Sequence, residues 1–307
     1  MFKKYRRVVK VTMLTKRVVP KMTVTNAANI TKQPEISDKA FKNIQALIYK
    51  LAGINLSEAK KTLVVGRLNK RLRYLQLPNF DSYYDYLVSK ESNKDQELQM
   101  FVDLLTTNET YFFREQLHFD FLVKNILPDF QTGKKKGQPL SIWSAASSSG
   151  EEGYTLCMLL AEHLGIDGNW RVLGTDISSV ILSDARKGVY DEHRVRLVPK
   201  SYRYKYLLKG TGSQKGRTAV VPELKKHIKF ESYNLVDSPL NKEAFDVIFC
   251  RNVLIYFDHK TKDKVVNRLC KNLKSDGYLF SGRSESLHSL SHTLTTVKPS
   301  IYQNVSV

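Results

Sequence analysis

The C-terminal half of the chain alternates short apolar runs with segments of helical periodicity, and this alternation restricts the fold more than any other feature. The apolar runs are typical of buried strands, and the amphipathic segments between several of them are typical of helices. The expected strands are 140–145, 170–175, 228–232, 245–250 and 278–282, and the expected helices are 152–164, 178–187 and 261–273. Strands that alternate with helices form a doubly wound, mostly parallel sheet, which is an α/β fold. Ligands of such a sheet bind at the carboxyl ends of its strands.

Helical spacing dominates the segment before this alternation. A helix is expected to start around Ser37 and to end at Gly53, and 83–88 and 96–105 predict two short helices. Another expected helix carries an apolar stripe of Val64, Leu68, Leu72 and Leu75. A chain of 307 residues is expected to form about two domains. We expect a basic extension at 1–35, an all-helical domain at 36–105, a linking helix and loop at 106–139, and an α/β domain at 140–307.

Residues 199–227 interrupt the alternation of strands and helices. Tyr202, Tyr204 and Tyr206 alternate with polar residues, as in a strand, and a run rich in turn formers follows before Thr218–Val221. The segment predicts either an inserted β-hairpin within a small subdomain or a long surface loop. We favour the subdomain.

Charge is the unusual part of the composition, with 49 basic and 30 acidic residues and a formal net charge of +19. Such a surface attracts nucleic acid, an anionic membrane or an acidic protein, and charge alone does not choose among them. Residues 1–35 are strongly basic. We expect them either to be a disordered tail or to result from a translation start assigned too early in the sequence. The alternative is that they tether the protein to a membrane or to nucleic acid. The sequence contains no run of about 18 apolar residues, so it predicts no transmembrane segment.

The cysteines and histidines predict neither a disulfide framework nor a metal site. Cys157, Cys250 and Cys270 are odd in number and widely spaced, which favours a reducing, cytoplasmic environment. The seven histidines do not cluster with cysteines or carboxylates.

Two expected strand ends carry residues suited to a cationic ligand with hydroxyl groups. The first strand ends in the small residues of 144–150, which let a ligand approach the backbone, and then in Glu151 and Glu152. Carboxylates there would repel a pyrophosphate but suit the sulfonium and ammonium groups of S-adenosylmethionine. Asp176 follows the next strand and is expected to bind ribose hydroxyls, to cap a helix, or to do both.

Polar residues also mark a later strand end and the junction between the two expected domains. Arg251 and Asn252 follow the strand 245–250. In the run TTNETYFFRE (106–115), a helix that begins near Thr110 would place Asn108 and Thr110 in its cap and Arg114 one turn inside. From spacing alone this run is an interdomain helix with capping residues, and Phe112 and Phe113 are expected to pack in the core.

Taken together, four segments resemble the chemotaxis receptor glutamate O-methyltransferases, the CheR-type family. The matching segments read TTNETYFFRE (106–115), IWSAASSSGEEGYTLCMLL (142–160), GTDISSVILSDARKGVY (174–190) and FDVIFCRNVLIYFDHKT (245–261). The resemblance runs from about Ile36 to Ser286, and the sequence departs from it at Ser149, where threonine is common, and at Arg283, where histidine is usual. It implies a Rossmann-like methyltransferase domain with a small β-subdomain, preceded by an all-helical domain.

The resemblance also implies an activity and a site. The protein would transfer a methyl group from S-adenosyl-L-methionine to glutamate carboxylates of chemotaxis receptors in the cytoplasm, leaving S-adenosyl-L-homocysteine. The residues implied for the cofactor are Asn108, Thr110, Arg114, Glu152, Asp176, Asn234, Leu235, Asn252 and Val253. Arg114 and Tyr256 would also face the methyl group and the incoming glutamate.

The expected partners follow from the same resemblance. AGINLSEAKKTLVVGRLNKRLR (52–73) is similar to the family's basic N-terminal domain, and Lys60, Arg67 and Arg71 would steer the acidic methylation helices of a receptor. The alternative interpretation is that these basic residues form a solvated face of the helix and bind no receptor. A nucleic-acid methyltransferase and a non-catalytic module that binds S-adenosylmethionine are the competing functions, although no Asn-Pro-Pro-Tyr tetrad or RNA-binding motif is present. We expect a monomer without nucleic acid or metal.

Overall fold

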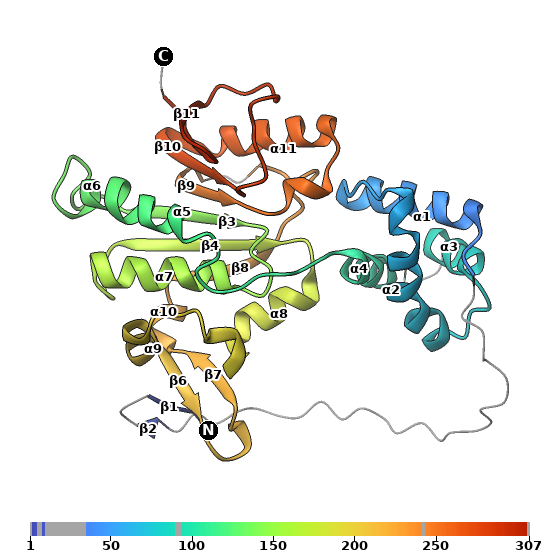
Figure 1. Cartoon of the computed structure of the whole chain (residues 1–307), viewed down its shortest axis with the longest axis horizontal. Helices are drawn as coiled ribbons and strands as arrows, with labels where there is room; N and C mark the ends of the chain where they lie inside the picture. The colour runs from blue at the N-terminus through green and yellow to red at the C-terminus, as the bar shows by residue number, and fades with distance from the viewer. Residues whose placement is uncertain (1, 5–7, 10–34, 90–93, 241–242, 306–307) are drawn as a thin grey trace.

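The N-terminal helices form a unit with its own core (Figure 1). The structure is a computed structural model, and it describes residues 2–4, 8–9, 35–89, 94–240 and 243–305. The helices are α1 (Asp38–Ala52), the 3-10 turn η1 (Glu58–Lys60), α2 (Lys61–Tyr74), α3 (Phe80–Val88) and α4 (Lys94–Leu105). Their buried faces meet in one cluster that includes Phe41, Ile44, Val64, Leu68 and Phe101. The predicted helices are confirmed, whereas the domain bounds stay a prediction.

Both ends of α1 confirm the start and the end expected from the sequence. The Ser37 side chain accepts a hydrogen bond from the Ala40 N–H, which satisfies a donor that the helix leaves unpaired. At the other end Gly53 adopts a left-handed φ of 70° and donates its N–H to the Tyr49 carbonyl. A β-carbon on Gly53 would lie 2.6 Å from Val236 Cγ2 and 3.0 Å from Thr261 Cγ2, so this turn also packs tightly against the following domain.

We expect Gly53→Ala to lower the free energy of unfolding by about 2 kcal/mol, because alanine is strained at positive φ and its methyl group would also clash. Gly66→Ala is the matched control. Gly66 lies inside α2, where an added β-carbon meets nothing within 4 Å. Alanine there should stabilise the protein by roughly 0.5–1 kcal/mol. Urea denaturation measures both changes, and a Gly53→Ala protein as stable as the unmodified one would contradict the expectation.

A seven-stranded sheet forms the centre of the second unit (Figure 1). Its strands are β3 (Leu140–Ala145), β4 (Trp170–Asp176), β8 (Ile228–Ser232), β9 (Phe245–Cys250), β10 (Leu273–Ser281), β11 (Thr295–Lys298) and β12 (Ile301–Gln303). They are ordered β11-β12-β10-β9-β3-β4-β8, and the five from β10 to β8 are parallel. The expected mostly parallel sheet is confirmed. The antiparallel pair β11 and β12 was not predicted, since these strands are short and β11 is exposed.

Helices cover both faces of this sheet, and alternate strand residues pack on opposite sides. They are α5 (Gln116–Phe121), the π-helix η2 (Leu122–Ile126), α6 (Leu127–Gln131), α7 (Glu151–Leu164), α8 (Ser179–Lys187) and α11 (His259–Lys271). Ile142 and Phe249 belong to the core under α7, whereas Trp143 and Ile248 belong to the core under α11. Because both faces are covered, every residue of the central strands β3 and β9 is buried.

A smaller antiparallel sheet is inserted between α8 and β8, as the subdomain interpretation predicted. Strands β5 (Val189–Asp191), β6 (Leu207–Gly210) and β7 (Arg217–Val220) pair antiparallel, with the 3-10 turns η3 (Glu192–Val195) and η4 (Gly212–Gln214) and the helices α9 (Lys200–Tyr206) and α10 (Pro222–Lys225) around them. The strand-like reading of Tyr202, Tyr204 and Tyr206 was wrong, because all three lie in α9. Tyr206 is buried there and its hydroxyl donates to Glu162 on α7.

Two N-terminal strands extend this smaller sheet. β1 (Phe2–Lys4) pairs antiparallel with β6, and β2 (Val8–Val9) pairs with β1. Most of the extension 1–35 lies outside the described residues, so its predicted disorder stays a prediction. Within the described ranges, no helix combines the length and the apolar character needed to cross a membrane.

Candidate active site

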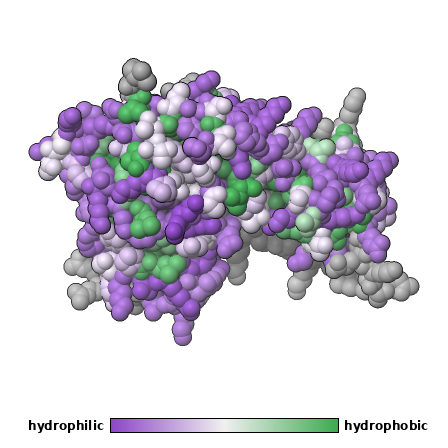
Figure 2. Space-filling view, turned by 45° about the horizontal axis from the view of Figure 1, so that its top comes forward, coloured by the Kyte–Doolittle hydropathy of each residue, from purple (hydrophilic) through white to green (hydrophobic). Residues whose placement is uncertain are grey.

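A cavity of about 420 Å³ lies at the carboxyl ends of β3, β4 and β9, where the helical unit meets the sheet. In the sheet order, the chain runs from β3 outward through β4 to β8, and then crosses to β9 on the other side of β3. The cavity lies beside this β3–β9 switch point, which is the usual ligand site of doubly wound sheets. Figure 2 shows hydrophobic surface gathered at the junction between the two units, within a mostly hydrophilic exterior. The volume suits one small organic ligand.

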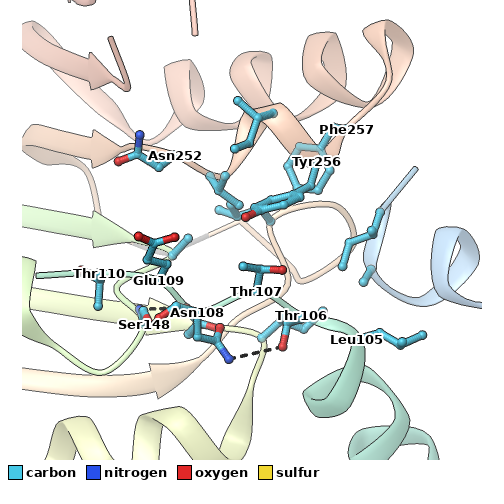
Figure 3. A pocket seen from close by; sticks show the side chains of 18 of the residues that line it. Leu105, Thr106, Thr107, Asn108, Glu109, Thr110, Ser148, Asn252, Tyr256 and Phe257 are labelled. Atoms are coloured by element: carbon cyan, nitrogen blue, oxygen red, sulfur yellow. Dashed lines mark hydrogen bonds between the residues drawn. The ribbon is translucent and has the colours of Figure 1, made fainter. Parts of the chain in front are cut away.

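One wall of the cavity is the extended segment 106–111, which we call the strap (Figure 3). Arg67 donates to the carbonyls of Leu105 at 2.7 Å and Thr106 at 3.0 Å, and the Ser148 hydroxyl donates to the Asn108 carbonyl at 3.0 Å. These carbonyls are held by side chains from both units and not by the N–H groups of a helix. The expected helix start near Thr110 was therefore wrong: the described stretch 106–115 contains no helix, and α5 begins at Gln116.

The turn after the strap anchors it to the second unit. Phe112 and Phe113 are buried as expected, with Phe112 edge-on to Tyr190 at 5.0 Å between ring centres. Phe113 and Glu115 have φ near 59° and 58°, a left-handed conformation that residues with a β-carbon rarely adopt. Such strain persists only where the surroundings enforce it, and it is common at functional sites.

The loop after β3 has the same unusual backbone. Ala146 and Ser148 adopt φ of 67° and 50°, although neither is glycine. The Asp176 carboxylate holds this loop, since it accepts the Ser148 N–H at 2.9 Å and the Ser178 N–H at 3.0 Å. Asp176 does not cap α8, because the side chain of Ser178 does so. The Asp176 side chain lines the cavity, and burial raises its pKa while the hydrogen bonds from the main chain oppose that rise.

A buried ion-pair network connects the turn after the strap with two strand ends. The Arg251 side chain is 1% exposed and lies 2.9 Å from Glu152 Oε2 and 3.0 Å from Glu115 Oε2, and it also donates to the Arg114 carbonyl. Glu152 Oε1 accepts from the Ser144 hydroxyl at 2.7 Å. The network holds Glu152 at the cavity wall and fixes the main chain of Arg114. Neither Glu115 nor Arg251 was expected to contact the cofactor, although the position of Arg251 directly after a buried strand marked it as a polar residue at the site.

Arg114 and Tyr256 both line the cavity but lie outside the side-chain contacts of this network. The Arg114 guanidinium donates to the Glu109 carbonyl at 2.8 Å and lies over the Tyr111 ring, and among the described residues it forms no ion pair with an acid. Figure 3 shows Tyr256 and Asn252 on the side of the cavity opposite the strap. A carboxylate that entered the cavity would therefore meet an arginine whose charge no described acid neutralises.

All nine expected cofactor residues line this one cavity, together with Tyr256, Lys60 and Arg67; the nine are Asn108, Thr110, Arg114, Glu152, Asp176, Asn234, Leu235, Asn252 and Val253. The Asn234 amide is already used, since it donates to the Leu51 carbonyl and accepts the Val236 N–H. Their roles toward a ligand stay predictions.

The three basic residues expected to contact a receptor helix have different surroundings in the structure. Lys60 lies at the cavity and has no ion-pair partner among the described residues, whereas Arg67 is bound to the strap. Arg71 does not line the cavity, because its guanidinium pairs with the buried carboxylate of Glu97 and lies over the Tyr74 ring. Only Lys60 and Arg67 of the three therefore line the cavity, and the expected role of all three toward a receptor helix stays a prediction.

The lining suits a ligand with a positive charge, hydroxyl groups and a flat apolar part. Glu152 and Asp176 supply carboxylates at neighbouring strand ends, and Leu235, Val253 and Ile177 supply apolar surface. S-adenosylmethionine has these three features, so the residues present fit it.

Comparison with known proteins decides the family. A model of the CheR methyltransferase SAM-binding domain matches residues 108–302, and a model of the CheR methyltransferase all-alpha domain matches residues 39–106. The chain belongs to the CheR methyltransferase family. It is a Rossmann-like methyltransferase whose cofactor is S-adenosylmethionine, as the sequence resemblance implied.

Curated members of the CheR family are similar over most of the chain. Chemotaxis protein methyltransferase 2 of Pseudomonas aeruginosa is 38% identical over 264 residues, which cover 85% of this chain and 91% of the relative. The chemotaxis protein methyltransferase of Borreliella burgdorferi is 38% identical, with coverage of 91% and 99%, and that of Salmonella typhimurium is 38% identical, with coverage of 85% and 88%. These names favour a methyltransferase of chemotaxis over the nucleic-acid enzyme and the non-catalytic module.

Proposed function

We propose that this protein transfers the methyl group of S-adenosylmethionine to glutamate side chains of chemotaxis receptors, forming methyl esters. The observation that carries the proposal is Arg114, an arginine without an acidic partner among the described residues, beside two carboxylates that suit the cofactor. The relatives are named chemotaxis protein methyltransferases, which supports receptors as the methyl acceptors.

The ionisable groups at the cavity suit a carboxylate acceptor, which needs no general base to take a proton. No histidine is among the described residues that line it. The nearby His118 is buried behind the site, where burial and the charge of Arg251 lower its pKa to about 4. Of the described carboxylates at the cavity, Glu152 is paired with Arg251, Asp176 accepts two main-chain N–H groups and Glu109 is exposed to solvent. A glutamate acceptor has a reference pKa of about 4.3 and is already ionised at neutral pH, so it needs no base.

The chemistry then depends on alignment. When bound, the cofactor supplies a methyl carbon on a sulfonium, so a carboxylate oxygen forms the new bond while the carbon–sulfur pair stays on sulfur, and no proton moves. Arg114 would orient the carboxylate through its fork of N–H donors. Contact with one oxygen would avoid stabilising the ground state as much as the transition state. Orientation of this kind can supply up to roughly 7–11 kcal/mol.

The remaining residues have proposed roles in binding. Glu152 would bind the cationic part of the cofactor and Asp176 its ribose, with Leu235 and Val253 against the base. Lys60, which is exposed at the cavity rim, would attract an acidic receptor helix. The three described cysteines are free thiols, which supports action in the reducing cytoplasm.

The acceptor can be tested directly with methyl-labelled S-adenosylmethionine, chemoreceptor membranes and RNA in one reaction. We expect label on the receptor band and its release as methanol in base, because methyl esters hydrolyse there and methylated nucleobases do not. The Arg114→Ala protein serves as the low-activity control. Label found on RNA alone, or receptor label that resists base, would reject the proposal.

A further inference from the structure

The β-subdomain contacts the loop after β3 from the side away from the cavity, and Arg194 in η3 makes most of the polar contacts. Its guanidinium forms an ion pair with Glu151, donates to the Ser149 hydroxyl at 3.0 Å and lies 3.5 Å from the Thr110 carbonyl. Tyr190 on β5 adds a hydrogen bond from its hydroxyl to the Ser149 carbonyl at 2.7 Å. One arginine thus joins the subdomain to both the loop and the end of the strap.

Glu151 is the buried charge that this contact neutralises. Its side chain has no exposed surface, and its polar contacts are the Ser149 hydroxyl at 2.7 Å and Arg194. A buried carboxylate strongly destabilises a fold unless it is paired, and removal of one partner leaves the other charge uncompensated. Burial raises the pKa of Glu151, and the Ser149 hydroxyl and the positive charge of Arg194 oppose that rise.

The position of Glu151 in the chain connects it with the cofactor residues. It is the first residue of α7, and the next residue, Glu152, lines the cavity. On the other side Ser148 is bound to Asp176. Any shift of 149–151 would therefore move the supports of Glu152 and Asp176, and misplacement by about 1 Å can weaken a site 100-fold.

We propose that Arg194 is a positioning residue for the cofactor loop, which holds Ser149, Glu151 and the strap in register without touching the cofactor. Arg194, Ser149 and Glu151 are absent from the described residues that line the cavity, so the effect acts through their neighbours. The inference goes beyond the proposed function, because it concerns the affinity for the cofactor whatever group accepts the methyl.

The test compares the affinity for S-adenosylhomocysteine among charge-matched variants by isothermal titration calorimetry, without any methyl acceptor. We expect Arg194→Gln to weaken binding about tenfold or more, equivalent to roughly 1.4 kcal/mol. In a separate assay with receptor membranes and saturating S-adenosylmethionine, its kcat should stay within about twofold, because the ligand then holds the loop. Arg196→Gln, two residues along and exposed, removes the same charge and should bind normally.

A compensating variant separates charge pairing from general damage. Glu151→Gln combined with Arg194→Gln should bind within about threefold of the unmodified protein, because no unpaired charge remains buried. Equal affinity of the Arg194→Gln and Arg196→Gln proteins, or a double variant weaker than Arg194→Gln alone, would overturn the proposal.

Circular dichroism checks that each variant is folded. If the Arg194→Gln protein does not fold, the affinity of the Arg194→Lys protein for S-adenosylhomocysteine tests the proposal instead. A single ammonium cannot reach Glu151, Ser149 and Thr110 together, so we expect binding about threefold weaker, and unchanged affinity would reject the proposal. Since the calorimetry uses no receptor, a failure of the affinity predictions does not bear on the proposed methyl acceptor, and the labelling experiment does not test this inference.

Discussion

Arg114→Ala is expected to lower kcat/KM for methyl transfer by roughly 100- to 1,000-fold, the effect of removing a preorganised charged donor from a reacting group. The guanidinium has no acidic partner among the described residues, so its loss leaves the incoming carboxylate without an orienting cation. Arg114→Lys keeps the charge but not the fork, and we expect a loss of roughly tenfold. Methyl transfer to receptor membranes at subsaturating receptor measures both.

The same variants separate orientation of the acceptor from binding of the cofactor. If Arg114 acts on the acceptor, the dissociation constant for S-adenosylhomocysteine should change much less than kcat/KM. Arg196→Ala, which removes a charge from an exposed position, should retain full activity. Equal activity of the Arg114→Ala, Arg114→Lys and unmodified proteins would exclude the proposed role.

Arg251→Leu is expected to lower the free energy of unfolding by about 3–5 kcal/mol, because it leaves buried carboxylates without their partner. Arg251 pairs with Glu115 and Glu152, both mostly buried, and also lies over the Phe119 ring. The loss should appear as a lower urea midpoint in chemical denaturation. Cofactor binding should weaken in the same protein, since Glu152 and the main chain of Arg114 lose their common support.

Arg171→Leu, on strand β4 of the same sheet, is the matched control. Arg171 pairs with Glu243 at 2.8 Å, but the two side chains are 56% and 59% exposed. Such a pair contributes less than about 1 kcal/mol in water. If Arg251→Leu shifted the midpoint no more than Arg171→Leu, the network would not have the structural importance inferred for it.

Much of the fold follows from local patterns. Strand β3 begins and ends where its apolar run does, and α1 begins after Ser37, because side-chain periodicity and capping chemistry act over a few residues. The three tyrosines before β6 show the limit of this argument. Their alternation suggested a strand, but they form α9, where burial of Tyr206 against α7 outweighs the local pattern.

The strap shows the same limit at the site. Its residues were identified from the sequence, but their conformation was not, because Arg67 and Ser148 hold the carbonyls that a helix would have used. Arg71 likewise shares the helical spacing of Lys60 and Arg67, but its guanidinium forms an ion pair with Glu97 of α4 and does not line the cavity. In both cases the deciding partner lies on another element.

By itself, the sequence determined the order of strands and helices, the polar residues at the strand ends and the family to which they belong. Only the tertiary structure decided how those residues are held. Arg251 meets Glu152 across 99 positions and Glu115 across 136, and Arg194 meets Glu151 from an inserted subdomain. The physical reason is that periodicity and capping report neighbours within a few residues, whereas the partner of a buried charge depends on which distant segments the fold brings together.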